Sequence, residues 1–264
     1  MRKAVPKRTA EHPVDGGLIV ASSALVRQEL RAGVCAVVKS APVRVVQRGE
    51  CALVTLLEKQ VNILVIGLSL PDWDGIDVAL AAQRIGAARQ IVLCVDRSCE
   101  RDFDLLHVSE STLLSSSCVY PGYWLRQEVV FATGLGRSSG RHVSADLQRD
   151  WRRRRVERRS YLHRLTPAQV RFLAFAGGGL GDKEVSDHFR ISVHTARAHR
   201  KDVMRKLDLH SHAEMIRYAS ICGLVRFTEE RVLRPGFDVD QLMASAAKQI
   251  ALRAKKCPLV APSV

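Results

Sequence analysis

The chain has 264 residues, of which 47% are hydrophobic and 26% are charged. This composition excludes a largely disordered chain, and the length suits one large or two small domains. No stretch has the roughly 18 consecutive apolar residues of a membrane span. The seven cysteines are scattered and form no CxxC pair, so we expect reduced thiols in a cytoplasmic protein.

Positive charge is concentrated in the C-terminal half. The net charge is +14; residues 1–140 hold 16 basic and 14 acidic side chains, whereas residues 141–264 hold 25 basic and 13 acidic ones. A nearly neutral part followed by a strongly basic part predicts a regulatory or interaction module followed by one that binds a polyanion such as nucleic acid. A basic excess can also be a soluble surface only, so the motifs have to decide.

The N-terminal half predicts an α/β domain after a disordered basic leader at 1–16. Within 17–137, strand-like and helix-like segments alternate, which is typical of a flavodoxin-like, doubly wound parallel sheet. The continuously apolar run at 62–67 suits a central strand that is covered on both faces. We expect strands at 17–21, 43–47, 62–67, 90–95 and 111–116, and helices at 22–33, 49–60, 76–86 and 124–135.

Residues 138–163 are interpreted as a basic linker, in which six arginines fall between Arg152 and Arg159. The run suits either a solvated tethering helix or an added phosphate contact, and the sequence does not choose between them. At the other end, 227–264 is an extension with one amphipathic stretch, Asp238 to Lys256. That stretch could pack on the body of the protein or pair with a partner helix.

Residues 164–226 predict a four-helix domain with clear boundaries. Thr166 can cap the first helix, with Pro167 at its first position and Gln169 closing a capping box. The first helix ends at Gly177–Gly179, where the sequence lacks the phosphate-binding GxxxxGK[ST] pattern. Asp182 can cap a short second helix at 183–189, Arg190–Ile191 form a tight turn, Ser192 caps a third helix that ends near Leu207, and a fourth runs from Ala213 to Cys222 before Gly223.

The third helix has one apolar face and one basic face, which is typical of a helix-turn-helix. A major groove about 12 Å wide admits one helix, and arginine and lysine reach base edges or phosphates from it. Any exposed helix can be basic, but here the turn, the caps and the domain charge agree. The apolar face holds Val193, Ala196, Val203 and Leu207; the basic face holds Arg197, Ala198, Arg200, Lys201 and Arg205.

This domain resembles the DNA-binding domain of the LuxR/FixJ (NarL-type) response-regulator family. Departures at Gln169, Ser186 and Ala196 keep size or role. The resemblance implies that Arg197, Ala198 and Lys201 face bases, that Lys183, Thr195, Arg200 and Lys206 face phosphates, and that the fourth helix supports dimerisation. His199 is a phosphate contact or, as we favour, a packed residue; the other histidines have no metal spacing. The positions in register are Leu165, Thr166, Leu173, Gly179, Lys183, Glu184, Val185, Ile191, Ser192, Thr195, His199, Lys206, Leu207, Ala219, Gly223 and Leu224.

The N-terminal half then resembles a receiver domain, because Pro71, Asp74 and Gly75 match the loop after the family's third strand. Receiver chemistry uses an aspartate at the end of that strand, two acids that hold Mg²⁺, a Ser/Thr after the fourth strand and a Lys after the fifth. Aligned by position, these places are taken by Gly67, by Ala21 and Ser22, by Cys94 and by Ser115. Asp74 is more simply a turn acid before Gly75.

The substitutions predict a pseudo-receiver without an acyl-phosphate or a metal site. Its pocket could be fixed in one state, gated by a small ligand at the strand ends, or serve only as a dimer surface. The whole chain is thus predicted to be a sequence-specific transcription regulator that binds promoter DNA as a homodimer, with RNA polymerase or an auxiliary regulator as a further partner and no enzyme activity or cofactor.

Two other functions remain open. One is a phosphorylatable two-component regulator in which a nearby acid such as Asp72 takes the phosphoryl group. The other is a protein-interaction adaptor whose basic domain contacts another protein. Phosphate contacts give an affinity for DNA that falls steeply with salt, so a salt titration separates the adaptor from a DNA-binding protein.

Overall fold

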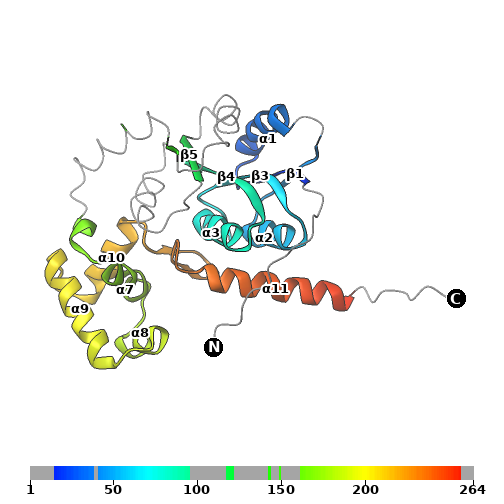
Figure 1. Ribbon diagram of the computed structural model, residues 1–264. Helices are drawn as coiled ribbons and strands as arrows, with labels where there is room; N and C mark the ends of the chain where they lie inside the picture. The colour runs from blue at the N-terminus through cyan, green and yellow to red at the C-terminus, as the bar shows by residue number, and fades with distance from the viewer. Residues whose placement is uncertain are drawn as a thin grey trace.

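The computed structural model describes residues 15–38, 41–95, 117–121, 142–143, 149 and 161–256. A parallel sheet with helices on its two faces is followed by a helical domain (Figure 1). This arrangement confirms the predicted fold class, and a further C-terminal helix follows the helical domain.

The sheet is parallel throughout and has the strand order β2-β1-β3-β4-β5-β6. Leu18 and Val20 pack in one apolar cluster with α2 and α3, whereas Ile19 lies in another with α1. Alternate side chains of a strand point to opposite faces, so both faces are covered. The strands are β1 (Asp15–Val20), β2 (Val43–Val46), β3 (Val61–Gly67), β4 (Ala88–Val95), β5 (Ser117–Pro121) and β6 (His142–Val143); the helices are α1 (Ala24–Val38), α2 (Gly49–Glu58) and α3 (Gly75–Ile85).

The far edge of the sheet differs from the sequence prediction. The described strand next to β4 is β5 at 117–121, where Cys94 lies opposite Tyr120. Leucines favoured the earlier stretch in sequence, but register with β4 decides where the strand lies. The expected strand at 111–116, the helix at 124–135 and the arginine run at 152–159 lie outside the described residues. β1 begins inside the predicted leader, and β6 lies inside the predicted linker.

The helical domain contains a 3-10 turn, η2 (Tyr161–Arg164), and the helices α7 (Pro167–Gly177), α8 (Asp182–Phe189), α9 (Val193–Leu207) and α10 (His212–Ile221). Thr166 and Ser192 cap α7 and α9 as predicted. Asp182 does not cap α8: Gly181 is the N-cap residue, and its N–H donates to Glu184. A Cβ at Gly177 would lie 2.3 Å from the Ala219 Cβ, so this glycine lets α7 and α10 pack closely.

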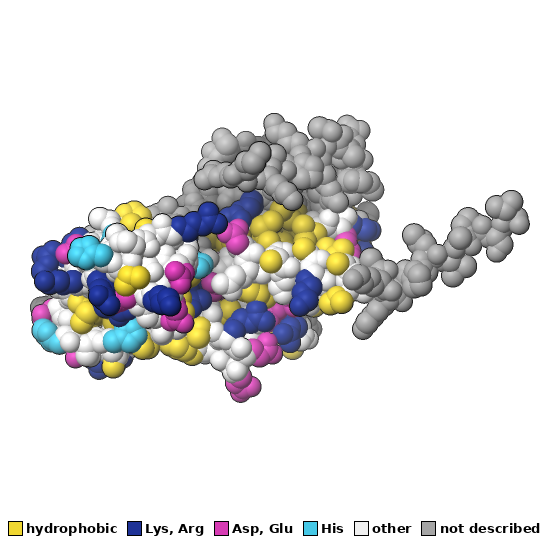
Figure 2. All heavy atoms as spheres, turned by 90° about the horizontal axis from the view of Figure 1, so that it is seen from below, with side chains coloured by type: hydrophobic (Ala, Val, Ile, Leu, Met, Phe, Trp, Pro, Cys, Tyr) yellow, Lys and Arg dark blue, Asp and Glu magenta, His cyan; other side chains and the backbone are white. Residues whose placement is uncertain are grey.

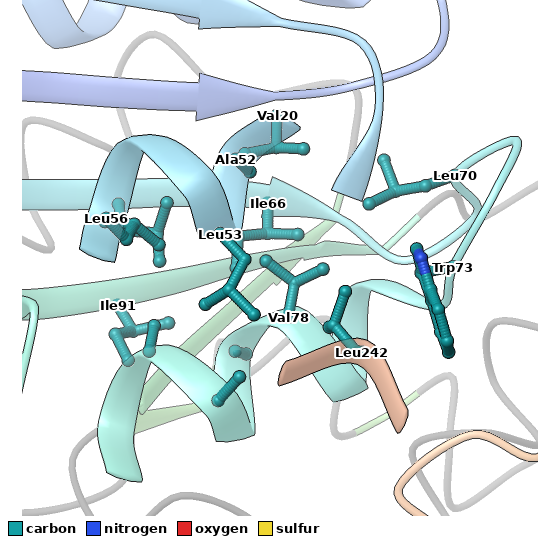
Figure 3. Packing of buried hydrophobic residues seen from close by; sticks show 14 of the residues in the cluster. Val20, Ala52, Leu53, Leu56, Ile66, Leu70, Trp73, Val78, Ile91 and Leu242 are labelled. Atoms are coloured by element: carbon teal, nitrogen blue, oxygen red, sulfur yellow. The ribbon is translucent and has the colours of Figure 1, made fainter. Parts of the chain in front are cut away.

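The extension folds back onto the sheet domain. It forms a two-stranded hairpin, β7 (Arg226–Phe227) and β8 (Val232–Leu233), and then α11 (Val239–Lys256). Of the two alternatives for the amphipathic stretch, the structure has packing on the body: α11 runs along α2 and α3 (Figure 1), and Leu242 lies beside Val78 (Figure 3).

Candidate nucleic-acid interface and receiver-like strand edge

α8 and α9 form the predicted helix-turn-helix. Arg190 adopts a left-handed conformation (φ 54°) at the turn, and the Ile191 N–H donates to the Ser186 carbonyl at 3.0 Å. Ala196, Val203 and Leu207 are buried in the domain core, and Val193 is half-buried. The apolar face predicted for the third helix is therefore the face that packs, which leaves its opposite face toward solvent.

The solvent face of α9 is basic. The side chains of Arg197 and Arg205 are 72% and 68% exposed, and Ala198 and Lys201 are exposed beside them. Figure 2 shows Lys, Arg and His side chains gathered over the end of the molecule that the helical domain forms. Arg197 lies 3.7 Å from Asp182, a contact too exposed and long to hold the guanidinium in place. These groups can therefore reach a polyanion.

Arg200 differs from its neighbours because its guanidinium is bound within the domain. Its side chain is only 18% exposed, and Nε donates to Asp182 at 2.6 Å. Its Nη2 donates to the Leu180 carbonyl, and its Nη1 contacts His212 Nδ1. Burial, and next the Arg200 charge, lowers the pKa of His212, so the ring stays neutral and accepts this hydrogen bond. Arg200 thus connects α8, α9 and the start of α10.

The other residues expected to face phosphates differ in exposure and in their hydrogen-bond partners. Lys183 is exposed, but Lys206 is half-buried and donates to Gln169 Oε1 at 2.7 Å. The Thr195 hydroxyl lies 2.8 Å from that of Ser192. His199 is half-buried with its ring 5.9 Å from Phe172, in line with the packed alternative. Asp182 and Gln169 were both expected as helix-capping residues, and their contacts with Arg200 and Lys206 were not foreseen from the sequence.

The receiver-like positions come together at the carboxyl edge of the sheet. Gly67 pairs with Cys94 across β3 and β4, and a Cβ at Gly67 would lie 3.9 Å from that of Ala21. The Ser22 hydroxyl donates to the Ser69 carbonyl. Ser115 lies outside the described residues, and the described strand β5 ends at Tyr120–Pro121.

This edge carries a cation where a receiver carries acids. Arg27 Nη1 donates to the carbonyls of Ala21 and Ser22 at 2.9 and 2.7 Å. A guanidinium there opposes binding of Mg²⁺ by charge repulsion. Among the described residues, no group of three or more His, Cys, Asp or Glu side chains could hold a metal ion. The sequence analysis did not single out Arg27, which follows β1 by seven residues.

The two nearby acids in the β3–α3 loop have structural roles. Asp72 is buried, and its carboxylate accepts from the Gly49 and Glu50 N–H groups at 2.8 and 3.1 Å, at the N-terminus of α2. Asp74 is buried as the N-cap of α3 and accepts from the Ile76 N–H, as expected of a turn acid.

Comparison with known proteins defines the class. Residues 163–219 match the family model described as bacterial regulatory proteins, luxR family, so this part of the chain is a LuxR-family helix-turn-helix domain. It is similar to transcriptional regulatory protein MctR of Rhizobium johnstonii, at 27% identity over 169 residues (62% of this chain, 73% of that protein). The Fimbriae Z protein of Escherichia coli K12 is 36% identical over 61 residues, 23% of this chain and 29% of that protein.

Solved response regulators align with much of the chain at low identity. Response regulator ChrA of a heme-sensing two-component system has a TM-score of 0.44 and 16% identity, covering 77% of this chain and 95% of that one. RcsB, in a structure of two dimers bound to two parallel DNAs, has a TM-score of 0.48 and 14% identity, covering 79% and 99%. Within the described part of this chain, no helix combines the length and hydropathy needed to cross a membrane.

Proposed function

We propose that the protein binds promoter DNA as a homodimer through α9 and that its receiver-like domain regulates without taking a phosphoryl group. The observation that carries the DNA-binding half is the basic solvent face of α9 on a packed helix-turn-helix. Two such units would read half-sites about one helical turn apart. Because its proposed target is promoter DNA, we expect the protein to act in the cytoplasm. RNA polymerase or an auxiliary regulator would be its further partner.

The proposed roles follow from how exposed each side chain is and from whether it already has a partner within the domain. Arg197, Ala198 and Lys201 are exposed and face base edges. Lys183, Thr195 and Lys206 face phosphates, the last after exchanging Gln169 for a phosphate oxygen. We assign Arg200 a positioning role instead of the phosphate contact expected from sequence, because Asp182 and His212 already take its guanidinium.

Phosphorylation independence is supported by the residues at the strand edge. Gly67 offers no carboxylate, and Arg27 spans the loop where acids would hold Mg²⁺. The alternative phospho-acceptor Asp72 has both carboxylate oxygens bound to backbone N–H groups of α2, which leaves it poorly placed to attack a phosphodonor. The receiver-like domain would then act through contacts alone.

A salt titration tests DNA binding. The affinity of the full chain for promoter fragments should fall steeply between 50 and 200 mM salt, with a slope of about −0.9 per phosphate contact. Lys201→Ala should weaken binding, whereas Lys248→Ala, which removes an equal charge from the exposed face of α11, should not. A flat salt response, or equal effects of the two variants, would favour the adaptor function instead.

Incubation with a small phosphodonor and Mg²⁺ tests the receiver-like domain. The wild-type chain should gain no acid-labile phosphoryl group, and DNA affinity should be the same with and without the donor. A phosphoprotein whose label is lost in Asp72→Asn, but kept in Glu58→Gln at an exposed position of α2, would refute phosphorylation independence while leaving DNA binding intact.

A further inference from the structure

The C-terminal arm, residues 226–256, is packed between the two domains. Val232 of β8 packs with the helical-domain core, and the next residue, Leu233, is buried in the sheet-domain core. Successive side chains of a strand point to opposite sides, so a two-residue strand can contact both domains at once. The hairpin therefore joins two separate apolar cores.

Polar and cation–π contacts fix the hairpin to both sides. The Arg226 guanidinium donates to the carbonyls of Leu70 and Trp73 in the β3–α3 loop. Arg231 lies over the Trp73 ring at 4.4 Å, and Arg234 lies over the Phe175 ring of α7 at 4.8 Å. Arg234 is 8% exposed, so the arm presents one buried cation to the DNA-binding domain and two arginines to the sheet domain.

The turn into α11 is anchored by a buried carboxyl group of α3. Asp77 Oδ1 accepts from the N–H groups of Gly236 and Asp238 at 3.0 and 3.2 Å. Asp238 in turn accepts from the Arg234 N–H at 2.6 Å. The backbone of this turn is thus held by α3 of the sheet domain rather than by the helical domain that precedes it in sequence.

α11 then covers the outer surfaces of α2 and α3. Val239, Leu242 and Ala246 are buried there, and Met243 and Ile250 pack at the margin. In Figure 3, Leu242 lies between α11 and the residues Val78 and Leu53. Ser245 bonds to Glu50 of α2, and Arg84 of α3 pairs with Asp240. Each fully buried leucine contributes about 1.5–3 kcal/mol, so these contacts hold the arm against α2 and α3.

α9 lies away from all of these contacts. Its main neighbours are α7, α8 and η2, and Figure 1 shows it on the side of the helical domain turned away from the sheet. Arg197, Lys201 and Arg205 are exposed in this state. Within the residues that the structure describes, the sheet domain and the arm leave the basic face of α9 uncovered.

We propose that the C-terminal arm locks the two domains in an arrangement that is already competent for DNA, so that no domain separation precedes binding. This inference rests on the proposed function. A regulator that must open shows an affinity reduced by the fraction of open molecules, and breaking its closed contacts raises that affinity. Here the arm holds α9 outward, and breaking the arm should free the domains without a gain in affinity.

The test uses full-length chains with matched leucine substitutions on α11. Leu242→Asp places a charge against α2 and α3, whereas Leu252→Asp changes a leucine of the same helix that is 49% exposed. Leu242→Asp should enlarge the radius of gyration in X-ray scattering and speed amide exchange in α11 by on the order of tenfold or more. Leu252→Asp should match the wild type. Unchanged scattering and exchange in Leu242→Asp would overturn the lock.

A milder pair covers the case in which Leu242→Asp unfolds the sheet domain. Arg226→Ala removes the hydrogen bonds to the carbonyls of Leu70 and Trp73. Arg253→Ala, at an exposed position of α11, is its control. Arg226→Ala should loosen the hairpin by the same exchange measurement, and Arg253→Ala should not. Equal exchange in the two variants would contradict the arm's role in joining the domains.

DNA affinity then separates the two proposals. In whichever arm variant stays folded, affinity for a promoter fragment should remain within about twofold of wild type. A gain of tenfold or more would show that the arm inhibits, and a similar loss would show that the arm belongs to the DNA interface; either overturns competence in the locked state. If no chain binds DNA, including wild type, the proposed function fails while scattering and exchange still decide whether the arm joins the domains.

Discussion

The Lys206 ammonium group donates to the side-chain carbonyl of Gln169 at 2.7 Å, which joins the end of α9 to the first turn of α7. Gln169 also accepts from the Thr166 N–H, so one amide oxygen closes the capping box and holds the lysine. Because this acceptor is neutral, Lys206 keeps its full positive charge at the proposed DNA surface. A carboxylate in the same place would cancel that charge.

Gln169→Glu should therefore weaken DNA binding. The new carboxylate would pair with Lys206 and lower affinity by about fivefold at low salt, with a salt slope smaller by nearly one phosphate contact. Stability against urea should stay equal or rise, since a charge-assisted bond replaces a neutral one. Gln241→Glu on exposed α11 is the control for added negative charge. Equal losses in the two variants would remove Lys206 from the interface.

Arg197→Ala should change which sequences are bound. Its exposed guanidinium is proposed to reach a base edge, so a preferred site selected from a random pool should lose about 1–3 kcal/mol of binding free energy, and sequence choice should relax at one position. The comparison is the same variant on random DNA. An equal loss there would assign Arg197 to the phosphate backbone.

Arg200→Ala should destabilise the helical domain. It leaves Asp182 and the Leu180 carbonyl without their shared partner, at a cost of about 1–3 kcal/mol in the free energy of unfolding measured with urea. Arg200→Lys should recover only part, because an ammonium group lacks the planar fork that reaches several acceptors. Arg197→Ala serves as the exposed control. A stable Arg200→Ala chain with lost DNA affinity would instead return Arg200 to the phosphate contacts expected from sequence.

Asp77 should make stability depend on pH. Burial, then the carboxyls of Asp74 and Asp238, raises its pKa well above the ordinary value, and the cations Arg234 and Arg231 face this cluster through Asp238. The unfolded chain loses this proton near pH 4. The stabilising effect is thus full below about pH 4 and is lost as pH rises toward the folded pKa.

Asp77→Asn keeps an oxygen for the Gly236 and Asp238 N–H groups and has no proton to lose. At pH 7 its free energy of unfolding should exceed that of wild type, and the difference should shrink toward pH 4 in thermal melts. Asp240→Asn, at an exposed position of α11, should show no such trend. A difference independent of pH would mean that Asp77 is already ionised in the fold.

Alanine substitutions at two glycines of the receiver-like edge should differ in their effect on stability. A Cβ at Gly75 would lie 2.3 Å from the Gly67 carbonyl oxygen, so Gly75→Ala forces the backbone apart and should cost about 1–3 kcal/mol in urea unfolding. A Cβ at Gly67 meets nothing closer than 3.7 Å, so Gly67→Ala should be nearly neutral. A large cost at Gly67 would show that space, rather than chemistry, excludes a side chain there.

The sequence predicted what local chemistry determines. The caps at Thr166 and Ser192 and the buried face of α9 follow from hydrogen-bonding side chains and helical spacing, and the structure has them there. Contacts between residues far apart in the chain could not be predicted from the sequence. The strand β5 lies at 117–121 because register with β4 selects it, and Arg200 turns inward because Asp182, 18 residues away, accepts a hydrogen bond from its guanidinium. Neither partner leaves a periodic signal.

The placement of Val232 and Leu233 in two different cores limits how this protein can be recombined. A chimera that exchanges only residues 163–225 would set a foreign α7 against Arg234 and Phe237, which here pack on Phe175. A one-residue insertion in β8 would turn each of the two side chains toward the wrong partner. The unit that can be grafted with these contacts intact is therefore the sheet domain, the helical domain and the C-terminal arm together, and a chimera boundary placed at Arg226 separates residues that pack on one another.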